Sequence, residues 1–449
     1  MQKTMSKYGN LFQDVQVARE ISGVQREESR RNALLQEGFT EQQVAAVSAP
    51  PGGVIVVAAG AGSGKTKTLT ERVVWLLSLG VPASDILVCT FTRKAAGEML
   101  KRIKSRLPDN AEMPFCGTTH ALSLQLLSRA QPELMARIRL LSEDEYTKYA
   151  ELLVRLAPAA LSKLGPKELL LRVQRFREEG DGPADIRILA DVWDELLADK
   201  GAWDFSMLIR ETLLHPPARI FKHILVDEAQ DLTALQLAWN VHHSAPSSTR
   251  FLCGDQDQSL YSFRGTASGV LADQVAQGAR KFVIDLNFRC ARLVLAHANN
   301  VISHNAGRIS SNLRPFRDIE GSVIVEAFDD STKEILAVQT YFKENPHFVV
   351  LARTRDMLIP FQNQGIPAMT IHESKGLEWK NVWVCGLEAG TLPHILGDFE
   401  EERRLFYVAI TRARDSLVIS YAKRREMGAK TITCSPSPFL YELQNIQAN

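Results

Sequence analysis

The chain has 449 residues, of which 45% are hydrophobic and 23% charged, which is typical of a soluble protein with about two to four packed domains. Its formal net charge of +1 argues against a globally basic, nucleic-acid-coating protein, so any site for a polyanion must be a local patch. The six cysteines form no C-x-x-C pair and no apolar run resembles a signal peptide or a membrane span, so we expect a cytoplasmic protein without a zinc or iron–sulfur site.

Residues 1–35 are polar and highly charged, and their pattern indicates a solvated helix or frayed arm. After this arm, short β-branched runs alternate with helical patterns, which is typical of a parallel sheet flanked by helices. The runs in the first half of the chain are Val54–Ala58, Ile86–Thr90, Ile224–Val226 and Phe251–Cys253.

The first of these runs leads directly into a glycine-rich segment and then into a helical pattern that reaches Leu79. The glycines allow backbone N–H groups to curl around a phosphate, and the start of a helix adds positive potential there. In such a loop Lys65 would reach the β- and γ-phosphates, and the Thr66 hydroxyl would bind Mg²⁺. The candidate loop residues are Ala59, Gly60, Ala61, Gly62, Ser63, Gly64, Lys65 and Thr66. By itself the loop predicts a nucleoside triphosphate ligand and nothing more specific.

Between His120 and Trp203 the strand signal vanishes, and apolar residues recur at helical spacing. We therefore expect an all-helical insertion within the first α/β domain. Its expected helical segments are Leu122–Leu127, Leu134–Leu141, Tyr146–Leu156, Leu169–Phe176 and Ile186–Leu197. A second alternating block begins near Lys281, and its expected strands are Val323–Glu326, Phe348–Leu351, Val382–Cys385 and Leu417–Tyr421.

An acidic pair follows the apolar strand Ile224–Val226 and complements the phosphate loop. Asp227, at the strand tip, would hold Mg²⁺ through water, and Glu228 would polarise the water that attacks the γ-phosphate. An isolated acidic pair in this position is more often a helix cap. Together with Lys65 and Thr66, however, the pair indicates a catalytic site.

Seven further segments, taken in order, resemble the motifs of the UvrD/Rep-type superfamily 1 DNA helicases. They are Thr90–Met99, Gly117–His120, Val226–Asp231, Gly254–Gly265, Asn287–Arg289, Thr370–Glu378 and Glu401–Ala413. The resemblance covers Phe39 to about Leu443. It implies two RecA-like P-loop domains, each a parallel α/β sheet flanked by helices, with a small helical insertion in the first.

The resemblance also implies the domain boundaries. After the arm of residues 1–35, domain 1A would comprise residues 36–120 and 204–275, insertion 1B residues 121–203, and domain 2A residues 276–449. The large 2B domain of the family falls between the motif with Arg353 and the motif that starts at Thr370. Here only Asp356–Met369 separate these motifs, so a minimal form without 2B is expected.

The nucleotide site implied by the resemblance draws on both domains. Its members are Gln43 for the adenine edge, Phe288 for base stacking, Gln258 as γ-phosphate sensor, Arg289 and Arg412 as arginine fingers, and Glu378 on the ribose side. Guanidinium groups clamp the charge that spreads over the transferred phosphoryl oxygens. Since the two arginines come from across a cleft, hydrolysis would depend on domain closure.

The DNA-binding residues are implied by their places in the same motifs. The candidates for stacking on bases are Phe91, His120, Tyr261 and Phe263, and those for phosphate contacts are Thr92, Thr118, Arg264, Arg353, His372 and Lys375. For single members, a core aromatic ring or a solvated helix face stays an open alternative.

These features together predict a helicase that uses ATP and Mg²⁺ to translocate on single-stranded DNA and to unwind duplex at single-strand/duplex junctions. The resemblance alone implies movement from 3′ to 5′. We expect a monomer with unidentified replication or repair proteins as partners. Two alternatives remain: a translocase that remodels protein–DNA complexes without processive unwinding, and an ATP-gated DNA-binding or loading module.

Overall fold

The computed structural model describes residues 25–159, 161, 163–260, 269–345, 347–427 and 430–443. Most of the predicted N-terminal arm lies outside these ranges, as do three of the candidate DNA contacts: Tyr261, Phe263 and Arg264. The described part of the arm is helical from residue 25 to residue 36. Within the described ranges, no helix combines the length and the apolar character needed to cross a bilayer.

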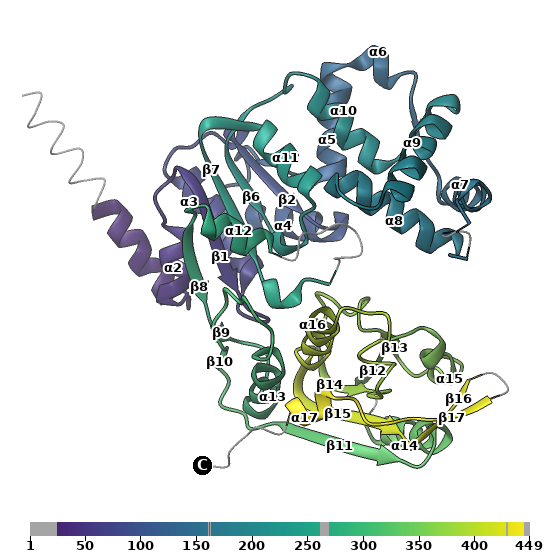
Figure 1. The fold of residues 1–449 in the computed structure, drawn as a ribbon. Helices are drawn as coiled ribbons and strands as arrows, with labels where there is room; N and C mark the ends of the chain where they lie inside the picture. Colours follow the sequence, from purple (N-terminus) through teal and green to yellow (C-terminus); the bar gives the residue numbers. More distant parts are fainter. Residues whose placement is uncertain are drawn as a thin grey trace, which may run out of the picture.

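The first α/β unit is built on a six-stranded parallel sheet with the order β3-β2-β6-β7-β1-β8 (Figure 1). Its strands are β1 (Gly53–Ala59), β2 (Ile86–Thr90), β3 (Phe115–Thr118), β6 (Phe221–Val226), β7 (Ser244–Gly254) and β8 (Arg280–Ile284). Its helices are α2 (Glu41–Val47), α3 (Lys65–Ser78), α4 (Arg93–Ser105), α5 (Thr119–Ala130), α10 (Phe205–Leu214), α11 (Ala234–His242) and α12 (Val270–Ala276). Helices α2, α3 and α4 cover one face, and α5, α10, α11 and α12 cover the other. Strand β1 is buried because both of its neighbours in the sheet and both helical layers enclose it, which fits its nearly continuous apolar sequence.

The expected start of the second domain at residue 276 is too early by one strand, because β8 (Arg280–Ile284) belongs to the first sheet. Strand β8 pairs in parallel with β1, with Val57 opposite Phe282, so the first sheet continues to Ile284. The alternation of strands and helices shows where a strand lies in the chain, but not which sheet it joins. We propose that the first α/β unit ends after Ile284.

The helical unit has its own core around Trp193 and packs beside the first sheet (Figure 1). Its main helices are α7 (Glu143–Leu156), α8 (Pro166–Glu179) and α9 (Ala184–Asp199). The prediction of an all-helical insertion needs two corrections. First, part of the expected helix over residues 134–141 is instead a two-residue strand, β4 (Arg139–Leu140), which follows the short α6 (Pro132–Met135) and pairs with β5 (Ala202–Trp203).

The second correction concerns helix α5. Its Leu122 and Leu126 belong to the core of the first sheet, whereas the core of the helical unit is formed by residues 141–202. Helical spacing identifies a helix but does not reveal which sheet or helix covers its apolar face. We therefore propose that α5 belongs to the first α/β unit.

A buried ion pair joins the helical unit to α10. Asp204 caps α10 through the backbone N–H of Met207 (2.8 Å), accepts a hydrogen bond from Trp193 Nε1 (2.9 Å) and pairs with the buried guanidinium of Arg177. Replacing Asp204 with alanine would leave that guanidinium without its main counter-ion. We expect the free energy of unfolding to fall by about 3 kcal/mol, measured by urea denaturation. Asp199→Ala, at the exposed end of α9, is the matched control and should change it by less than about 0.5 kcal/mol.

The second α/β unit contains a five-stranded parallel sheet with the order β11-β15-β14-β12-β13. Its strands are β11 (Ser322–Phe328), β12 (Phe348–Ala352), β13 (Ala368–Thr370), β14 (Trp379–Val384) and β15 (Ala413–Ala422). Its helices are α13 (Arg292–Ile302), α14 (Ser331–Glu344), α15 (Ile359–Gln362), α16 (Phe399–Ile410) and α17 (Phe439–Glu442). The short pairs β9 (Leu286–Asn287) with β10 (Arg314–Pro315), and β16 (Arg424–Met427) with β17 (Lys430–Thr433), complete the unit. The predicted α/β fold with two parallel sheets is confirmed.

A short connection joins β12 to β13 in the second unit. It contains only the 3₁₀ turn η5 (Asp356–Leu358), the four-residue helix α15 and a turn. Leu358 and Phe361 of this connection are buried in the core beside β12. The expected span for a 2B insertion is therefore occupied by a compact, packed crossover.

Candidate functional site

The glycine-rich loop lies between the end of β1 and the start of α3, at the carboxyl edge of the first sheet. Gly62 and Gly64 have φ values of +64° and +84°, which glycine adopts without strain. A Cβ at Gly62 would lie 2.6 Å from Arg289 Cβ, and one at Gly64 would lie 2.8 Å from Gln43 Nε2, so side chains would also clash. Lys65 Nζ spans the loop at 3.3 Å from Ala59 O and 3.4 Å from Gly60 O. This geometry fits a bound phosphate chain.

The two candidate metal ligands meet beside the loop, although they are far apart in the sequence. Thr66 Oγ1 donates a hydrogen bond of 3.1 Å to Asp227 Oδ2. Burial and the neighbouring charge of Glu228 together raise the pKa of Asp227 to about 6, although Lys65 opposes the shift. A hydroxyl and a carboxylate are the hard oxygen donors that Mg²⁺ prefers, so this pair fits a divalent cation.

Glu228 is held in an unusual backbone conformation directly after β6. Its φ of 52° makes it the one non-glycine residue with positive φ among the described residues. Strained backbone of this kind is often found at functional sites. Burial raises the pKa of Glu228, but Lys65, Lys375 and Arg412 outweigh it, so the pKa lies below its usual value. The carboxylate is therefore ionised at neutral pH and can accept a proton.

One amide, that of Gln230, connects Glu228 to the next motif. Its Nε2 donates to Glu228 Oε2 (2.6 Å), and its Oε1 accepts from the backbone N–H of Asp255 (2.9 Å). A Cβ at Gly254 would lie 2.4 Å from the same Oε1, so glycine leaves the room for this contact. The candidate base Glu228 and Asp255, which precedes the turn η3 (Gln256–Gln258), are thus joined by a single side chain.

The second α/β unit supplies the two arginines on the other side of the loop. Arg289 Nε donates to Glu378 (2.6 Å) and its Nη1 to Thr411 O (3.1 Å). Arg412 is buried, and burial, with help from Arg289, lowers its pKa to about 9. Its Nη2 donates to Gln258 Oε1 (3.2 Å), so the predicted finger and the predicted sensor are in contact. Glu378, the expected ribose contact, holds Arg289 here.

Two hydrogen bonds to carbonyl groups of the loop also tie it to the second unit. Asn287 Nδ2 donates to Ala61 O (2.7 Å), and the Phe288 N–H donates to Gly62 O (2.9 Å). The Phe288 ring lies 4.8 Å from that of Phe316, which is 62% exposed. Phe316 was not identified from the sequence, because an isolated surface phenylalanine carries no motif.

Gln43, the expected adenine contact, is buried against the loop. Its Nε2 donates to Ser63 O (3.0 Å), and its Oε1 accepts from the backbone N–H of Thr40 (2.9 Å) as part of a capping box. Both ends of the amide are therefore engaged. Each end is engaged once, which leaves one N–H and one oxygen lone pair of the amide for an adenine edge.

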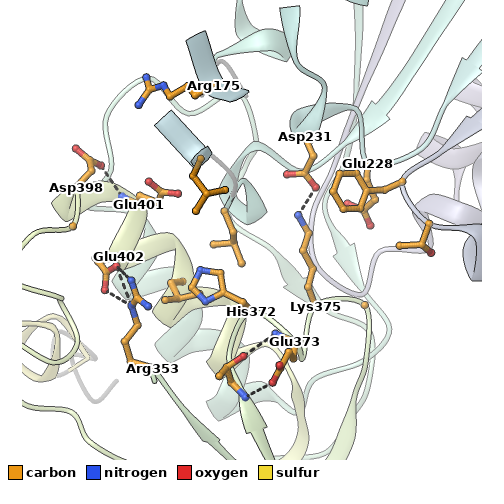
Figure 2. Close-up of a pocket in the computed structure, with 18 of the residues that line it drawn as sticks. Arg175, Glu228, Asp231, Arg353, His372, Glu373, Lys375, Asp398, Glu401 and Glu402 are labelled. Carbon is orange, nitrogen blue, oxygen red and sulfur yellow. Dashed lines mark hydrogen bonds and ion pairs between the residues drawn. The ribbon is translucent and has the colours of Figure 1, made fainter. Parts of the chain in front are cut away.

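Four side chains of the second unit converge on η3. Arg308 pairs with Asp257 (2.8 Å), Arg404 Nε donates to Ser259 O (3.2 Å), and Arg412 reaches Gln258. Lys375 contacts Asp231 and donates to Gln258 O (2.9 Å), and Figure 2 shows it pointing toward Asp231. Lys375 was expected at a DNA phosphate. The structure instead places it between the two α/β units, near the candidate base Glu228.

A cleft of about 1760 Å³ runs between the two α/β units and the helical unit (Figure 2). Five candidate DNA contacts line it: Phe91, Thr92, Arg353, His372 and Lys375. The other two described candidates, Thr118 and His120, line an adjacent cavity of about 400 Å³ that also borders Phe91. The structure therefore brings all the described candidates for DNA binding to two neighbouring cavities.

Several of these groups already have partners in the protein. The hydroxyls of Thr92 and Thr118 cap α4 and α5 by accepting hydrogen bonds from the backbone. Arg353 forms a two-pronged pair with Glu402 at 2.8 to 3.1 Å. These hydroxyls could still donate to a phosphate, whereas Arg353 would have to share its carboxylate partner.

Phe205 is an aromatic residue at this site that sequence reasoning missed. It is the first residue of α10, is 43% exposed, and its ring lies 4.9 Å from that of His120. Both rings line the smaller cavity. In the sequence, Phe205 could have been noticed only as an apolar residue at the start of a helix, directly after the capping residue Asp204.

The two candidate histidines are neutral at physiological pH. Burial lowers the pKa of both His120 and His372 to about 4, helped at His372 by neighbouring Arg353. We expect the affinity for single-stranded DNA to change by less than about threefold between pH 8 and pH 6, measured by fluorescence anisotropy. A steep rise toward pH 6 would show that a histidine binds phosphate as a cation.

The same pKa shifts affect stability with a defined sign. The unfolded chain takes up protons on these rings at about pH 6.5, whereas the folded chain does so only near pH 4. Stability should therefore fall as the pH drops through this window.

Two family models match the chain, and both are consistent with the phosphate-binding loop described above. The model of the UvrD/REP helicase N-terminal domain matches residues 39–275, and that of the UvrD-like helicase C-terminal domain matches residues 350–424. The chain belongs to the UvrD/REP helicase family.

Curated relatives support the same assignment at moderate identity. DNA helicase II of Haemophilus influenzae is 29% identical over 310 residues, which cover 62% of this chain and 42% of the relative. ATP-dependent DNA helicase UvrD1 of Mycobacterium tuberculosis is 29% identical over 317 residues (62% and 41%), and DNA helicase II of Escherichia coli is 28% identical over 306 residues (63% and 42%). The chain thus matches about two fifths of the length of these relatives.

Proposed function

We propose that this protein is an ATP-dependent DNA helicase that moves along single-stranded DNA, from 3′ to 5′, and separates duplex at junctions. One observation carries the proposal: the candidate base Glu228, the sensor Gln258 and the finger Arg412 are linked through Gln230 and η3 beside the cleft. The names of the relatives, which include an ATP-dependent DNA helicase, support it.

The nucleotide would bind between the two α/β units. The N–H groups of residues 60–66 and the ammonium of Lys65 would hold the phosphates, and Thr66 and Asp227 would hold a magnesium ion. That ion, when bound, neutralises charge on the β- and γ-phosphate oxygens. Glu228 accepts the proton of the attacking water, while Arg289 and Arg412 clamp the charge on the transferred group.

Movement would follow from closure of the cleft. The contacts of Arg308, Lys375, Arg404 and Arg412 on η3 all come from the second unit, so a change in domain separation must move or break them. Phe91, His120 and Phe205 would stack on bases without reading sequence, and Thr92, Thr118, Arg353 and His372 would contact the backbone. The two α/β units would then bind the strand alternately, and this alternation would advance the strand.

The test uses duplexes with a single-stranded tail on either the 3′ or the 5′ side, with ATP and Mg²⁺. Strand separation of the 3′-tailed substrate alone is expected, and the Lys65→Ala variant should be inactive. Unwinding of only the 5′-tailed duplex would overturn the polarity, and equal stimulation of ATP hydrolysis by RNA would overturn the substrate.

A second candidate is a translocase that clears proteins from DNA without processive unwinding. The compact crossover at η5 and α15 favours it, because this crossover replaces the span where the family carries a large insertion. DNA-stimulated ATP hydrolysis with displacement of a bound protein, but without strand separation, would support this candidate over the helicase.

A further inference from the structure

An apolar turn projects from the second α/β unit. Leu396 is 87% exposed and Ile395 is 81% exposed, which makes them the most exposed large hydrophobic side chains in the described ranges. Neither belongs to the hydrophobic clusters formed by those residues, so their side chains contribute little to the core. Adjacent exposed aliphatic side chains of this kind often mark a contact surface.

The turn is firmly held at its base. Leu392, just before it, is fully buried in the core, and Phe399, just after it, packs against Phe439 with ring centroids 5.1 Å apart. Within the turn, the N–H of Gly397 donates to His394 O (2.9 Å). The two apolar side chains are therefore presented by a closed turn on a fixed base.

Glu402 connects the turn to a candidate phosphate contact. One of its carboxylate oxygens accepts a hydrogen bond from the backbone N–H of His394 (2.9 Å), and both of its oxygens accept from Arg353. A Cβ at Gly397 would lie 2.8 Å from Glu402, so the turn packs directly on this carboxylate. The position of the apolar tip is thus linked to the position of Arg353.

One of the two apolar side chains, that of Leu396, lies on the wall of the large cleft, and Ile395 precedes it in the turn. Leu396 lines the cleft together with Phe91 and Arg353. Asp398 and Glu401 also line it, and Figure 2 shows them on the side of Arg353 and Glu402. These carboxylates repel a phosphate backbone, so a strand that passes this wall would turn its bases rather than its phosphates toward Leu396. Base faces are apolar and accept aliphatic side chains regardless of sequence.

We propose that Ile395 and Leu396 form an apolar finger that packs against the bases of the DNA strand in the cleft. The inference rests on the proposed function and adds a substrate contact to it. The finger would act without base-specific hydrogen bonds, and Arg353, through Glu402, would set its place relative to the backbone.

The test replaces both residues with serine, Ile395→Ser/Leu396→Ser. The probe is a fluorescein-labelled oligo-dT, and its Kd is measured by anisotropy between about 50 and 200 mM salt. We expect binding about tenfold weaker at every salt concentration, with an unchanged slope of log Kd against log salt, because loss of an apolar contact releases no counter-ions. DNA-independent ATP hydrolysis should not change.

Two controls separate a base contact from other causes. Leu214→Ser alters a side chain that is 76% exposed at the end of α10 and does not line the cleft, so it should bind oligo-dT like the wild type. An abasic oligonucleotide of the same length keeps the phosphates but lacks the bases. The double variant and the wild type should bind it equally.

Three outcomes would overturn the proposed finger. They are an unchanged affinity of the double variant for oligo-dT, an equal loss of that affinity in the Leu214→Ser variant, or an equal loss of the double variant's affinity for the abasic strand. Failure of the wild type to bind single-stranded DNA at all would instead refute the proposed function.

Discussion

Replacing Arg289 with alanine is expected to lower kcat for DNA-stimulated ATP hydrolysis by about a thousandfold, with little change in ATP affinity. The Cβ of Arg289 would lie 2.6 Å from a Cβ placed at Gly62, so its side chain starts directly beside the phosphate loop. Its guanidinium could therefore share charge that develops on the transferred phosphoryl group. Bound ATP would keep its contacts with the phosphate loop, so the affinity for ATP should be retained. Steady-state hydrolysis and equilibrium titration with a fluorescent ATP analogue measure the two effects separately.

Arg292→Ala is the matched control for this experiment. Arg292 is also a paired arginine, bound to Asp318 and Glu320 at 3.0 Å, but it lies on α13 away from the loop. Its loss should leave kcat within about twofold of wild type. If Arg289→Ala weakened ATP binding and spared kcat, Arg289 would be a binding residue and not a finger.

Glu228→Gln should also reduce kcat by about a thousandfold, because the amide cannot accept the proton of the attacking water. The substitution keeps the size of the side chain and still offers an oxygen to Gln230 Nε2, so the fold of the site should persist. We expect ATP to remain bound, and ATP-dependent affinity for single-stranded DNA to be retained. Rapid-quench measurement of a single turnover tests the chemical step directly.

The control here is Glu151→Gln, on the exposed face of α7. It makes the same chemical change far from the loop and should not alter the single-turnover rate. Hydrolysis by Glu228→Gln at a wild-type rate would require another base, and Asp231, buried beside Lys375, would be the next candidate.

The sequence predicts best what is encoded locally. The loop Ala59–Thr66, the acidic pair at Asp227 and most strands could be located because glycine spacing and β-branched runs are short-range patterns. Strand β2 has the same bounds as predicted, and β1 differs by one residue at each end. The residue roles drawn from the family resemblance stay predictions, although the structure gathers the described candidates around one loop and two neighbouring cavities.

Partners across the fold could not be predicted, because they depend on which sheet or helix a segment packs against. Nothing in the local sequence places β8 beside β1 or α5 in the core of the first sheet. The same is true of Lys375, whose motif suggests a phosphate but whose ammonium contacts Asp231. Phe205 and Phe316 escaped notice for a related reason, since exposure and ring contacts appear only in three dimensions.

The single amide of Gln230 has a consequence for how signals can cross this site. An amide has one donor end and one acceptor end, and here the donor serves Glu228 while the acceptor serves the N–H of Asp255. Flipping the amide would place its oxygen against the Glu228 carboxylate and its NH₂ group against the N–H of Asp255, so both hydrogen bonds would be lost. Glu228 and the backbone of Asp255 therefore share one side chain, and a shift of either that rotates this amide would break both hydrogen bonds together.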